Sequence, residues 1–398
     1  MKILCLLGRN AYGDPRRGAG VEFQAFVPAL QSLGHDVKIF DSHAKGIFSS
    51  YATCNQKLLE AVNLFQPECI LNVQFDVEVW IETLLEIRRR NSAILINWST
   101  DDTWKYAKLS CYIGRYHHGM ATTYVECVEK YKHDGVENVH VTQWAANKEW
   151  LQLPKSARDC RYQVSFVGIA YGDRRKIISE LAQKGIEVAC FGHQWPAGSV
   201  AYEQMPIIMR DSVISLNFSK GLYGGANQIK ARNFEVPGAG GFLLTEHAPG
   251  IEHWYDVGTE IAVWDNIDDL AKKIQYYLEN PELRDEMALR AHARTVKEHL
   301  YEHRMSALVD FASSLSRESY ESPELKISFT EAMLRHRSNA LLRTMKGGIC
   351  FFCRIIWGKD RSKRYARRIA LELFLKFRGV GVYSGVSWFG RMFPPELL

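Results

Sequence analysis

The sequence holds 398 residues, of which 46% are hydrophobic; this is too long for one ordinary core and has the composition of a globular protein. The net charge of +5 is unevenly distributed along the chain. Positions 325–398 hold 15 basic and 4 acidic residues, a balance of +11, whereas the preceding residues hold 35 basic and 41 acidic residues, a balance of −6. The slightly acidic body argues against nucleic acid as its partner, since a phosphate-binding surface needs clustered positive charge.

In the first part of the chain, short apolar runs alternate with stretches of helical period, the pattern of a parallel sheet wound with helices. Strands are expected at Lys2–Leu7, Asp36–Phe40, Cys69–Val73, Ala93–Trp98, Gly119–Thr123 and Val139–Thr142. Helices are expected at Val21–Leu33, Asn55–Phe65, Val79–Arg90 and Glu126–Asp134. The pattern lapses near the Leu-Pro-Lys-Ser stretch at 153–156, which is interpreted as a linker.

The same alternation then restarts. Strands are expected at Val164–Val167, Glu187–Phe191, Val213–Phe218, Gly241–Thr245 and Glu260–Val263, and helices at Arg174–Lys184, Tyr202–Asp211, Gln228–Pro237, Ile267–Leu278 and Pro281–Phe311. We therefore expect an α/β protein with two doubly wound, Rossmann-like domains, at 1–155 and 156–320, and a basic tail at 321–398.

Cysteine content and apolar runs indicate the compartment. The nine cysteines are scattered and odd in number, which favours reduced thiols, and the lone Cys350-x-x-Cys353 is interpreted as helix packing rather than a zinc site. The apolar start stops at Gly8, too early for a signal peptide, and no run of eighteen apolar residues follows. These features predict a cytoplasmic protein.

The segment with the strongest chemical signal runs from Gln228 through Glu235 into an apolar stretch that ends at Glu246. Arg232 and Glu235 are three residues apart, so on a helix they share a face. The cation could then meet a diphosphate while the carboxylate accepts hydrogen bonds from ribose hydroxyls. The alternative is an ordinary surface ion pair at the same spacing.

With these residues the sequence resembles the CgeB-like glycosyltransferases, which belong to the broader group-one class with the GT-B fold. The resemblance rests on Arg232–Glu246, Pro249–Glu252, Arg290–Arg304, Val164–Gly168 with Arg174-Arg175, and Asn97–Trp104. It covers roughly residues 1–316. It implies two Rossmann-like domains that face a cleft, with the acceptor held by the first domain and a nucleotide-diphosphate sugar by the second.

The resemblance also implies roles on the donor side. Glu235 matches the second glutamate of the family's Glu, seven residues, Glu motif and would hold the nucleotide ribose. The first position of that motif is Asn227 here, a departure, because a neutral amide does not supply the same charge toward the transferring sugar. Arg174, with Lys230 or Arg232, would neutralise the leaving diphosphate without a metal or other cofactor. Gly168, Gly192 and Glu252 are assigned to the same donor site.

On the acceptor side, Asp101 and Asp102 follow an expected strand at its carboxyl end, where open α/β sheets build their sites. Either could act as a base on the acceptor hydroxyl, or could cap a helix. Adjacent aspartates on a strand point to opposite sides, so they do not form a two-ligand metal site as simply as Asp-x-Asp does. No metal site is expected.

Two further motifs lie in the first domain. Gly18, Gly20 and Glu22 stand between the first strand and the first helix, and the missing third glycine of a dinucleotide fingerprint argues against NAD binding there. The resemblance implies that these residues form the loop facing the cleft and the acceptor. The adjacent His117 and His118 have the wrong spacing for one helical face and are interpreted as a solvated pair.

The tail from Leu325 interleaves arginine and lysine with phenylalanine, isoleucine, tryptophan and leucine. This pattern is typical of a basic amphipathic helix on anionic lipid, and we expect contact of 325–398 with the inner face of the membrane. The alternative is packing of the tail on the acidic body.

Together these observations predict a glycosyltransferase of the hexosyltransferase type, which moves a sugar from a nucleotide-diphosphate sugar to a carbohydrate, lipid or protein acceptor. Two rivals remain. One is a nucleotide-sugar epimerase, because the same double fold hosts such isomerases. The other is a non-catalytic binding or coat-assembly protein, which the departure at Asn227 motivates.

Overall fold

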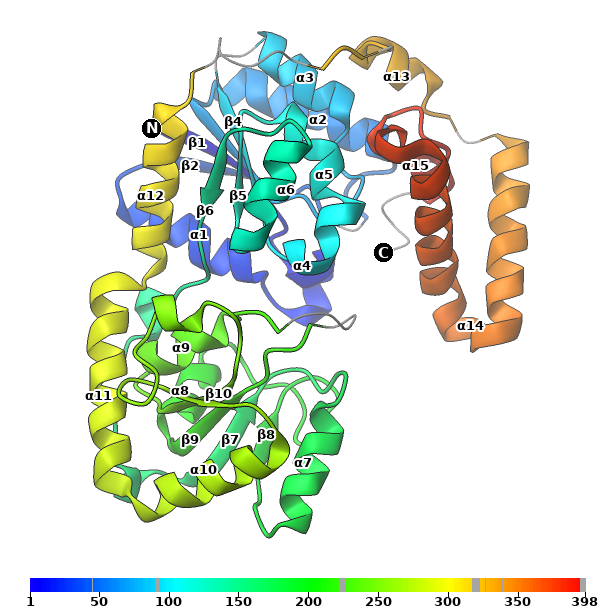
Figure 1. Ribbon diagram of the computed structural model, residues 1–398. Helices are drawn as coiled ribbons and strands as arrows, with labels where there is room; N and C mark the ends of the chain where they lie inside the picture. The colour runs from blue at the N-terminus through cyan, green and yellow to red at the C-terminus, as the bar shows by residue number, and fades with distance from the viewer. Residues whose placement is uncertain are drawn as a thin grey trace. The chain divides into compact units, whose positions relative to one another are not determined.

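The protein forms two compact units. The computed structural model describes residues 1–44, 46–90, 93–221, 227–316, 323–325, 327–337 and 339–393. Unit 1 joins Met1–Thr142 to Met305–Leu398, and unit 2 is the continuous segment Gln143–Arg304. In Figure 1 unit 2 is the green to yellow part, and unit 1 combines the blue and cyan part with the orange and red end of the chain.

Unit 1 is built on a six-stranded parallel sheet with the strand order β2-β1-β3-β4-β5-β6. Its strands are β1 Lys2–Leu6, β2 Asp36–Phe40, β3 Cys69–Asn72, β4 Ile94–Ser99, β5 Gly119–Thr122 and β6 Val139–Val141. The connecting helices include α1 Val21–Ser32, α2 Tyr51–Phe65, α3 Ile81–Arg90, α4 Asp102–Lys105, α5 Ser110–Ile113 and α6 Val128–His133. Strands β3, β4 and β5 are buried along their whole length, as expected of parallel strands between two helix layers.

Unit 2 repeats this plan with a five-stranded parallel sheet in the order β11-β10-β9-β7-β8. Its strands are β7 Tyr162–Val167, β8 Ala189–Phe191, β9 Ser212–Asn217, β10 Leu243–Glu246 and β11 Ala262–Trp264. Its helices are α7 Arg174–Gln183, α8 Gln204–Arg210, α9 Arg232–Gly238, α10 Ile267–Glu279 and α11 Pro281–Glu298. The expected pair of Rossmann-like α/β domains is confirmed.

Two of the differences from the sequence-based helices have a clear cause in the backbone hydrogen bonds. The helix expected from Gln228 begins only at Arg232, because the amide of Gln228 bonds the carbonyl of Ser219 (3.0 Å) and the amide of Lys230 bonds the side chain of Asn233 (2.8 Å). The single helix expected over 281–311 is two helices, α11 and α12 (Tyr301–Ser314). It breaks where the backbone on either side of Leu300 exchanges hydrogen bonds with Ala146.

The compact units also divide the chain at other places than 155 and 320. The segment after Thr142 already packs in unit 2, where Trp150 lies in a core cluster. From Met305 the chain returns to unit 1, and Phe311 of α12 stacks on His140 at a ring-centroid distance of 5.2 Å. A Cβ on Gly119 of β5 would meet this same ring at 2.7 Å, which explains the glycine there.

The tail is helical, as expected, and it is part of unit 1. It contains α13 Phe329–Arg335, the long α14 Ala340–Arg378, which bends at Gly358 (φ 78°), and α15 Trp388–Met392. We call the segments 340–357 and 359–378 the first and second arms of α14; in Figure 1 they lie side by side as a hairpin. In the second arm, Arg367 forms an ion pair with Asp76 (2.5 Å) and donates a hydrogen bond to Tyr51 (3.3 Å).

Tail side chains fill part of the main core of unit 1. Buried members from the tail are Ala332, Leu342, Cys353, Ala366, Ala370, Leu375, Val382, Tyr383, Phe389, Met392 and Phe393. The carboxylate of Glu82 in α3 accepts a hydrogen bond from the amide of Gly385 (3.0 Å) and another from the hydroxyl of Ser384. Packing of the tail on the body, one of the two expected alternatives, therefore occurs for this part of it. Within the described residues, no helix is long and apolar enough to span a bilayer.

Candidate functional site

The order of strands in unit 2 points to a binding edge. From β7 the chain passes to β8 on one side and then crosses to β9 on the other, so the direction of winding switches between β7 and β9. In open parallel sheets, ligands bind at the carboxyl ends of the strands beside such a switch. The segments that follow β7 and β9 carry Arg174 and lead to Arg232, two of the cations expected to bind the donor.

Arg174 opens α7 and is buried, with 8% of its surface exposed. Its guanidinium donates hydrogen bonds to the carbonyl oxygens of Ile169 (2.9 Å) and Phe218 (3.2 Å) and to the hydroxyl of Tyr171 (2.9 Å). It also lies 3.8 Å from the centroid of the Tyr171 ring. These partners are neutral, so they hold the guanidinium in place and leave its positive charge at the sheet edge. Burial lowers the pKa of Arg174 from its ordinary value.

Arg232 and Glu235 form the ion pair that their spacing allows, but the pair is not an ordinary surface contact. The side chain of Glu235 is only 4% exposed and that of Arg232 22%. Arg232 also donates to the carbonyl oxygen of Val167 at the end of β7 (2.9 Å). Burial, with the nearby charge of Arg174, lowers the pKa of Arg232 to about 10. Arg174, Arg232 and Glu235 thus come together at the carboxyl end of β7.

Three other donor candidates lie near this edge, Asn227, Lys230 and Glu252. The side-chain amide of Asn227 donates a hydrogen bond to the carbonyl oxygen of His247 (2.7 Å), so it ties its own loop to the segment after β10. Glu252 pairs with the His247 ring (2.8 Å) and is half exposed. Lys230 is half-buried beside α9. The carboxylate of Glu246, at the end of β10, accepts from the amide of Ser219 (2.7 Å).

Gly168 and Gly192 bring the ends of β7 and β8 into close contact. A Cβ on Gly192, where φ is +132°, would lie 2.2 Å from the carbonyl oxygen of Gly168. That same oxygen accepts a hydrogen bond from the indole of Trp195 (2.8 Å). A Cβ on Gly168 would lie 2.6 Å from the ring of Phe166, so neither position has room for a side chain without a shift of its neighbour.

In unit 1 the two adjacent aspartates have different environments. Asp102 is 1% exposed, and its carboxylate accepts hydrogen bonds from the hydroxyls of Ser110 (2.6 Å), Thr122 (2.6 Å) and Tyr131 (2.8 Å). Burial raises the pKa of Asp102, although these hydroxyls oppose the effect. Its expected role as an acceptor base does not fit this buried position. Asp101 is half-buried and precedes α4 at the N-cap position, but its side chain makes no capping hydrogen bond.

Unit 1 has its own switch, between β1 and β3, and charged side chains gather beside it. Lys105 of α4 is buried, and its ammonium lies 3.9 Å from the centroid of the Phe75 ring. Burial lowers the pKa of Lys105, while the charges of Asp101 and Glu22 oppose this shift. Burial raises the pKa of Glu22, and Lys105 opposes it. The structure therefore brings Asp101 and Glu22, two of the expected acceptor-side residues, near one cation.

The glycine loop before α1 is shaped by close backbone contact. Gly20 donates its amide to the carbonyl of Arg9 (2.9 Å), and a Cβ on Gly20 would lie 2.7 Å from the carbonyl oxygen of Gly8. Gly18 adopts a φ of +79°, a conformation that favours glycine, with open space where a Cβ would stand. Gly20 is thus required by close backbone contact, and Gly18 is favoured by its positive φ.

A histidine–carboxylate pair that the sequence does not predict lies at the same edge. The Nε2 atom of His43 lies 2.9 Å from the carboxylate of Glu78, and both side chains are less than a tenth exposed. Glu78 also accepts hydrogen bonds from the amides of Phe75 and Asp76. The position of Glu78 a few residues after an expected strand is the one signal for it in the sequence. His43 is 35 residues away, so the sequence does not link the two residues.

The structure corrects the interpretation of His117 and His118. Both are buried, because the chain at this point enters β5 and the core rather than solvent. His117 bonds the carbonyl of Ile113 (3.0 Å), and the Nδ1 atom of His118 accepts from the amide of Leu95 (2.9 Å). Neither belongs to a group of ligands, and within the described residues no cluster of histidine, cysteine and carboxylate side chains could hold a metal ion.

Residues 174–310 match the family model described as glycosyl transferase-like. The matched segment starts at Arg174 and includes Arg232 and Glu235. No curated protein gives a significant match to the chain.

Solved structures with a similar fold support the architecture. Sucrose-phosphate synthase from Thermosynechococcus elongatus is 12% identical, with a TM-score of 0.58 over 79% of this chain and 100% of that one. The HepE protein of Anabaena in complex with UDP is 11% identical, with a TM-score of 0.55 over the same shares. A glycosyltransferase from Rickettsia africae is 8% identical, with a TM-score of 0.53 over 78% of this chain and 98% of that one. The two parallel-sheet units match the GT-B glycosyltransferase architecture.

Proposed function

We propose that this protein is a glycosyltransferase that transfers a sugar from a nucleotide-diphosphate donor. The observation that carries the proposal is the pair of neighbouring guanidiniums at the switch point of unit 2, from the buried Arg174 and the half-buried Arg232. Arg174 is held by neutral groups, so its charge is not cancelled and keeps a strong field in a region of low dielectric. A diphosphate is the anion that these cations would stabilise. The stabilisation would be greatest as the diphosphate leaves the sugar, because its negative charge grows at that point.

We further infer that the donor's nucleotide is UDP, since the HepE structure of similar fold holds UDP. Glu235 would accept hydrogen bonds from the ribose hydroxyls, and Lys230 would add a third cation near the diphosphate. The motifs from Arg232 to Arg304 favour the CgeB-like branch of these enzymes. All nine cysteines are free thiols, which fits a cytoplasmic location.

In the proposed reaction, the oxygen of an acceptor hydroxyl bonds to the anomeric carbon of the sugar. The bond from that carbon to the diphosphate oxygen breaks, and the electron pair leaves with the diphosphate. Arg174, Lys230 and Arg232 neutralise this charge, so that the step needs no metal ion. The hydroxyl proton passes to a general base, for which Asp101 is the candidate, because Asp102 is buried and hydrogen-bonded.

The first test measures binding of UDP by calorimetry and transfer from UDP-sugars to an acceptor panel. Glu235→Ala should weaken donor binding about tenfold, equivalent to about 1.4 kcal/mol. Arg232→Ala should slow turnover more than it weakens binding, because the charge develops in the transition state. Arg290→Ala serves as the control, since Arg290 forms an exposed ion pair with Glu286 on α11. If neither Glu235 nor Arg232 affects binding or turnover, the proposal is wrong.

The second candidate function is nucleotide-sugar binding without catalysis, and Asn227 favours it, because its amide is hydrogen-bonded to the backbone at the expected sugar-facing position. Incubation of the protein with a UDP-sugar, with and without acceptors, separates the alternatives. A transferase needs the acceptor, an epimerase converts the donor alone, and a binding protein leaves every sugar unchanged.

A further inference from the structure

The first arm of α14 presents an apolar stripe to solvent in addition to its buried face. Its inner face, with Leu342, Ile349 and Cys353, packs in or against the core of unit 1. The outer stripe consists of Leu341, Phe351, Phe352, Ile355 and Ile356, each between 52% and 68% exposed. At about 100° of rotation per residue, Leu341, Phe352 and Ile355 fall within about 60° of one another around the helix axis, and Phe351 and Ile356 flank them on either side. A stripe of this size on a folded protein marks an interaction surface.

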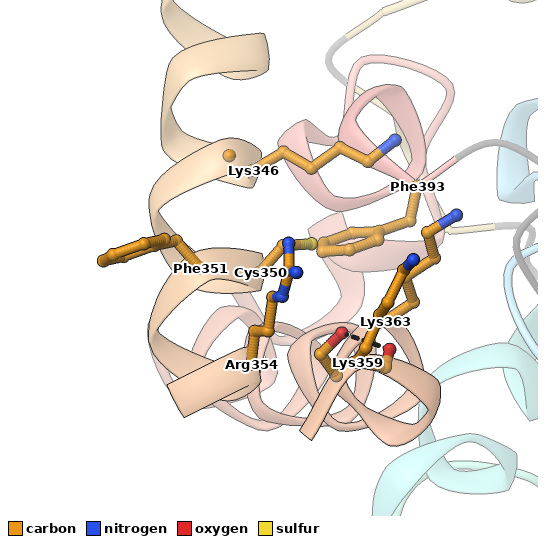
Figure 2. Close-up of a pocket in the computed structure, with 9 residues that line it drawn as sticks. Lys346, Cys350, Phe351, Arg354, Lys359, Lys363 and Phe393 are labelled. Carbon is orange, nitrogen blue, oxygen red and sulfur yellow. Dashed lines mark hydrogen bonds between the residues drawn. The ribbon is translucent and has the colours of Figure 1, made fainter. Parts of the chain in front are cut away.

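Beside this stripe, a basic pocket of about 430 Å³ opens between the two arms of α14. Four cations line it, Lys346 and Arg354 from the first arm and Lys359 and Lys363 from the second. Figure 2 shows these side chains around the ring of Phe393 and the sulfur of Cys350, while Phe351 points away from the pocket. The described residues that line the pocket include no carboxylate. The cations therefore present a site for an anionic group.

The cations of the pocket are close enough to influence one another. The Lys346 ammonium lies 5.9 Å from the centroid of the Phe393 ring. Burial lowers the pKa of Lys346, and the charge of Lys363 adds to this shift. An anion bound between them would relieve that repulsion.

We propose that the first arm of α14 docks on an anionic bilayer, with the apolar stripe inserted between the lipids and a headgroup phosphate in the basic pocket. Charge selects this occupant. A second copy of the chain would bring the same four cations against each other, which is unfavourable, whereas an anionic surface attracts all of them. An arm with aromatic and aliphatic side chains on one face and flanking cations matches a helix that lies in the plane of the interface.

The experiment is co-sedimentation of the full chain with vesicles of phosphatidylcholine alone and with vesicles that also contain phosphatidylglycerol. Binding is expected only to the anionic vesicles, and added salt should weaken it. The double variant Phe352→Ser/Ile355→Ser should reduce binding at least tenfold, since it removes two apolar side chains from the stripe. Lys359→Gln/Lys363→Gln should reduce it about 25-fold, which is about fivefold for each cation.

Matched controls keep the test independent of folding. Leu334→Ser replaces an equally exposed apolar side chain on α13, and Lys148→Gln/Lys272→Gln removes two exposed cations of unit 2; both should bind like the original chain. Equal binding to neutral and anionic vesicles, or full binding by both double variants, would overturn the proposal. A dimer in light scattering that Phe352→Ser/Ile355→Ser dissociates would overturn it in favour of a second copy.

Discussion

At the scale of single residues, neighbours in the sequence have opposite environments. Asp101 and Asp102 are adjacent, yet only Asp102 points into the core, where three hydroxyls donate to it. In unit 2, Arg174 is held by carbonyl groups while the next residue, Arg175, is exposed. The chemistry available at each position therefore depends on which face of its element the side chain occupies.

This contrast predicts separable effects of the two aspartates. Asp102→Ala leaves three buried hydroxyls without their acceptor and should lower the free energy of unfolding by about 1–3 kcal/mol. Asp101→Asn should leave stability within about 0.5 kcal/mol and slow sugar transfer, if Asp101 takes the acceptor proton. Urea unfolding and turnover assays on both variants measure this. Unchanged transfer by Asp101→Asn would remove Asp101 from the mechanism.

At the scale of elements, His299 marks the break between α11 and α12. Its Nε2 atom donates to the carbonyl of Trp254 (2.8 Å), and its Nδ1 atom faces the Arg304 guanidinium at 3.3 Å. Burial, together with the charge of Arg304, lowers the pKa of His299 to about 4. The ring is therefore neutral at pH 7, and a second proton would face a cation.

An acid sensitivity follows from this arrangement. Between the ordinary histidine pKa of about 6.5 and pH 4, the unfolded chain binds a proton that the folded chain does not, so stability falls as the pH falls through this window. From pH 7 to pH 4.5 the loss should be about 2.5 kcal/mol. The His299→Gln variant should be less stable at pH 7, and its free energy of unfolding, measured with urea, should depend less steeply on pH. An equally steep dependence in that variant would assign the effect to other groups.

The second arm of α14 is attached to unit 1 by a nearly buried ion pair, Arg367 with Asp76. Arg367→Ala should cost about 3–5 kcal/mol, because it leaves Asp76 charged and without its partner. The double variant Arg367→Met/Asp76→Leu should recover most of the loss, since it removes both charges and keeps the volume. Thermal unfolding of the original chain, the single variants Arg367→Met and Asp76→Leu and the double variant measures the coupling, and additive losses would show that the pair is not coupled.

The same elements show what the sequence could and could not predict. The buried parallel strands were predicted, because apolar runs of four to six residues between helices admit few other structures. The grouping of Arg174, Arg232 and Glu235 followed from the resemblance. The start of α9 and the break at Leu300 were not predicted, since both depend on backbone hydrogen bonds to distant segments. The pairing of His43 with Glu78 depends on tertiary structure in the same way.

At the scale of the whole molecule, the tail belongs to the core of unit 1 rather than forming an appendage. A chain that ends at Glu324 should therefore lose the stability of unit 1, because its core would lack the buried tail side chains. Calorimetry should show a lowered or missing transition for unit 1, and a chain ending at Phe393 is the matched control. If the shorter chain unfolds like the full one, the tail does not stabilise unit 1.

The insertion of unit 2 within unit 1 has a consequence for synthesis. When the ribosome has made the first 304 residues, unit 2 has its whole sequence, while unit 1 still lacks most of α12 and all of α13, α14 and α15. The apolar surface that these helices later cover, around Trp80 and Tyr51, is exposed in the nascent chain until the last helices emerge. Chaperones should therefore bind mainly to the incomplete unit 1, which is the part of the nascent chain most prone to aggregate.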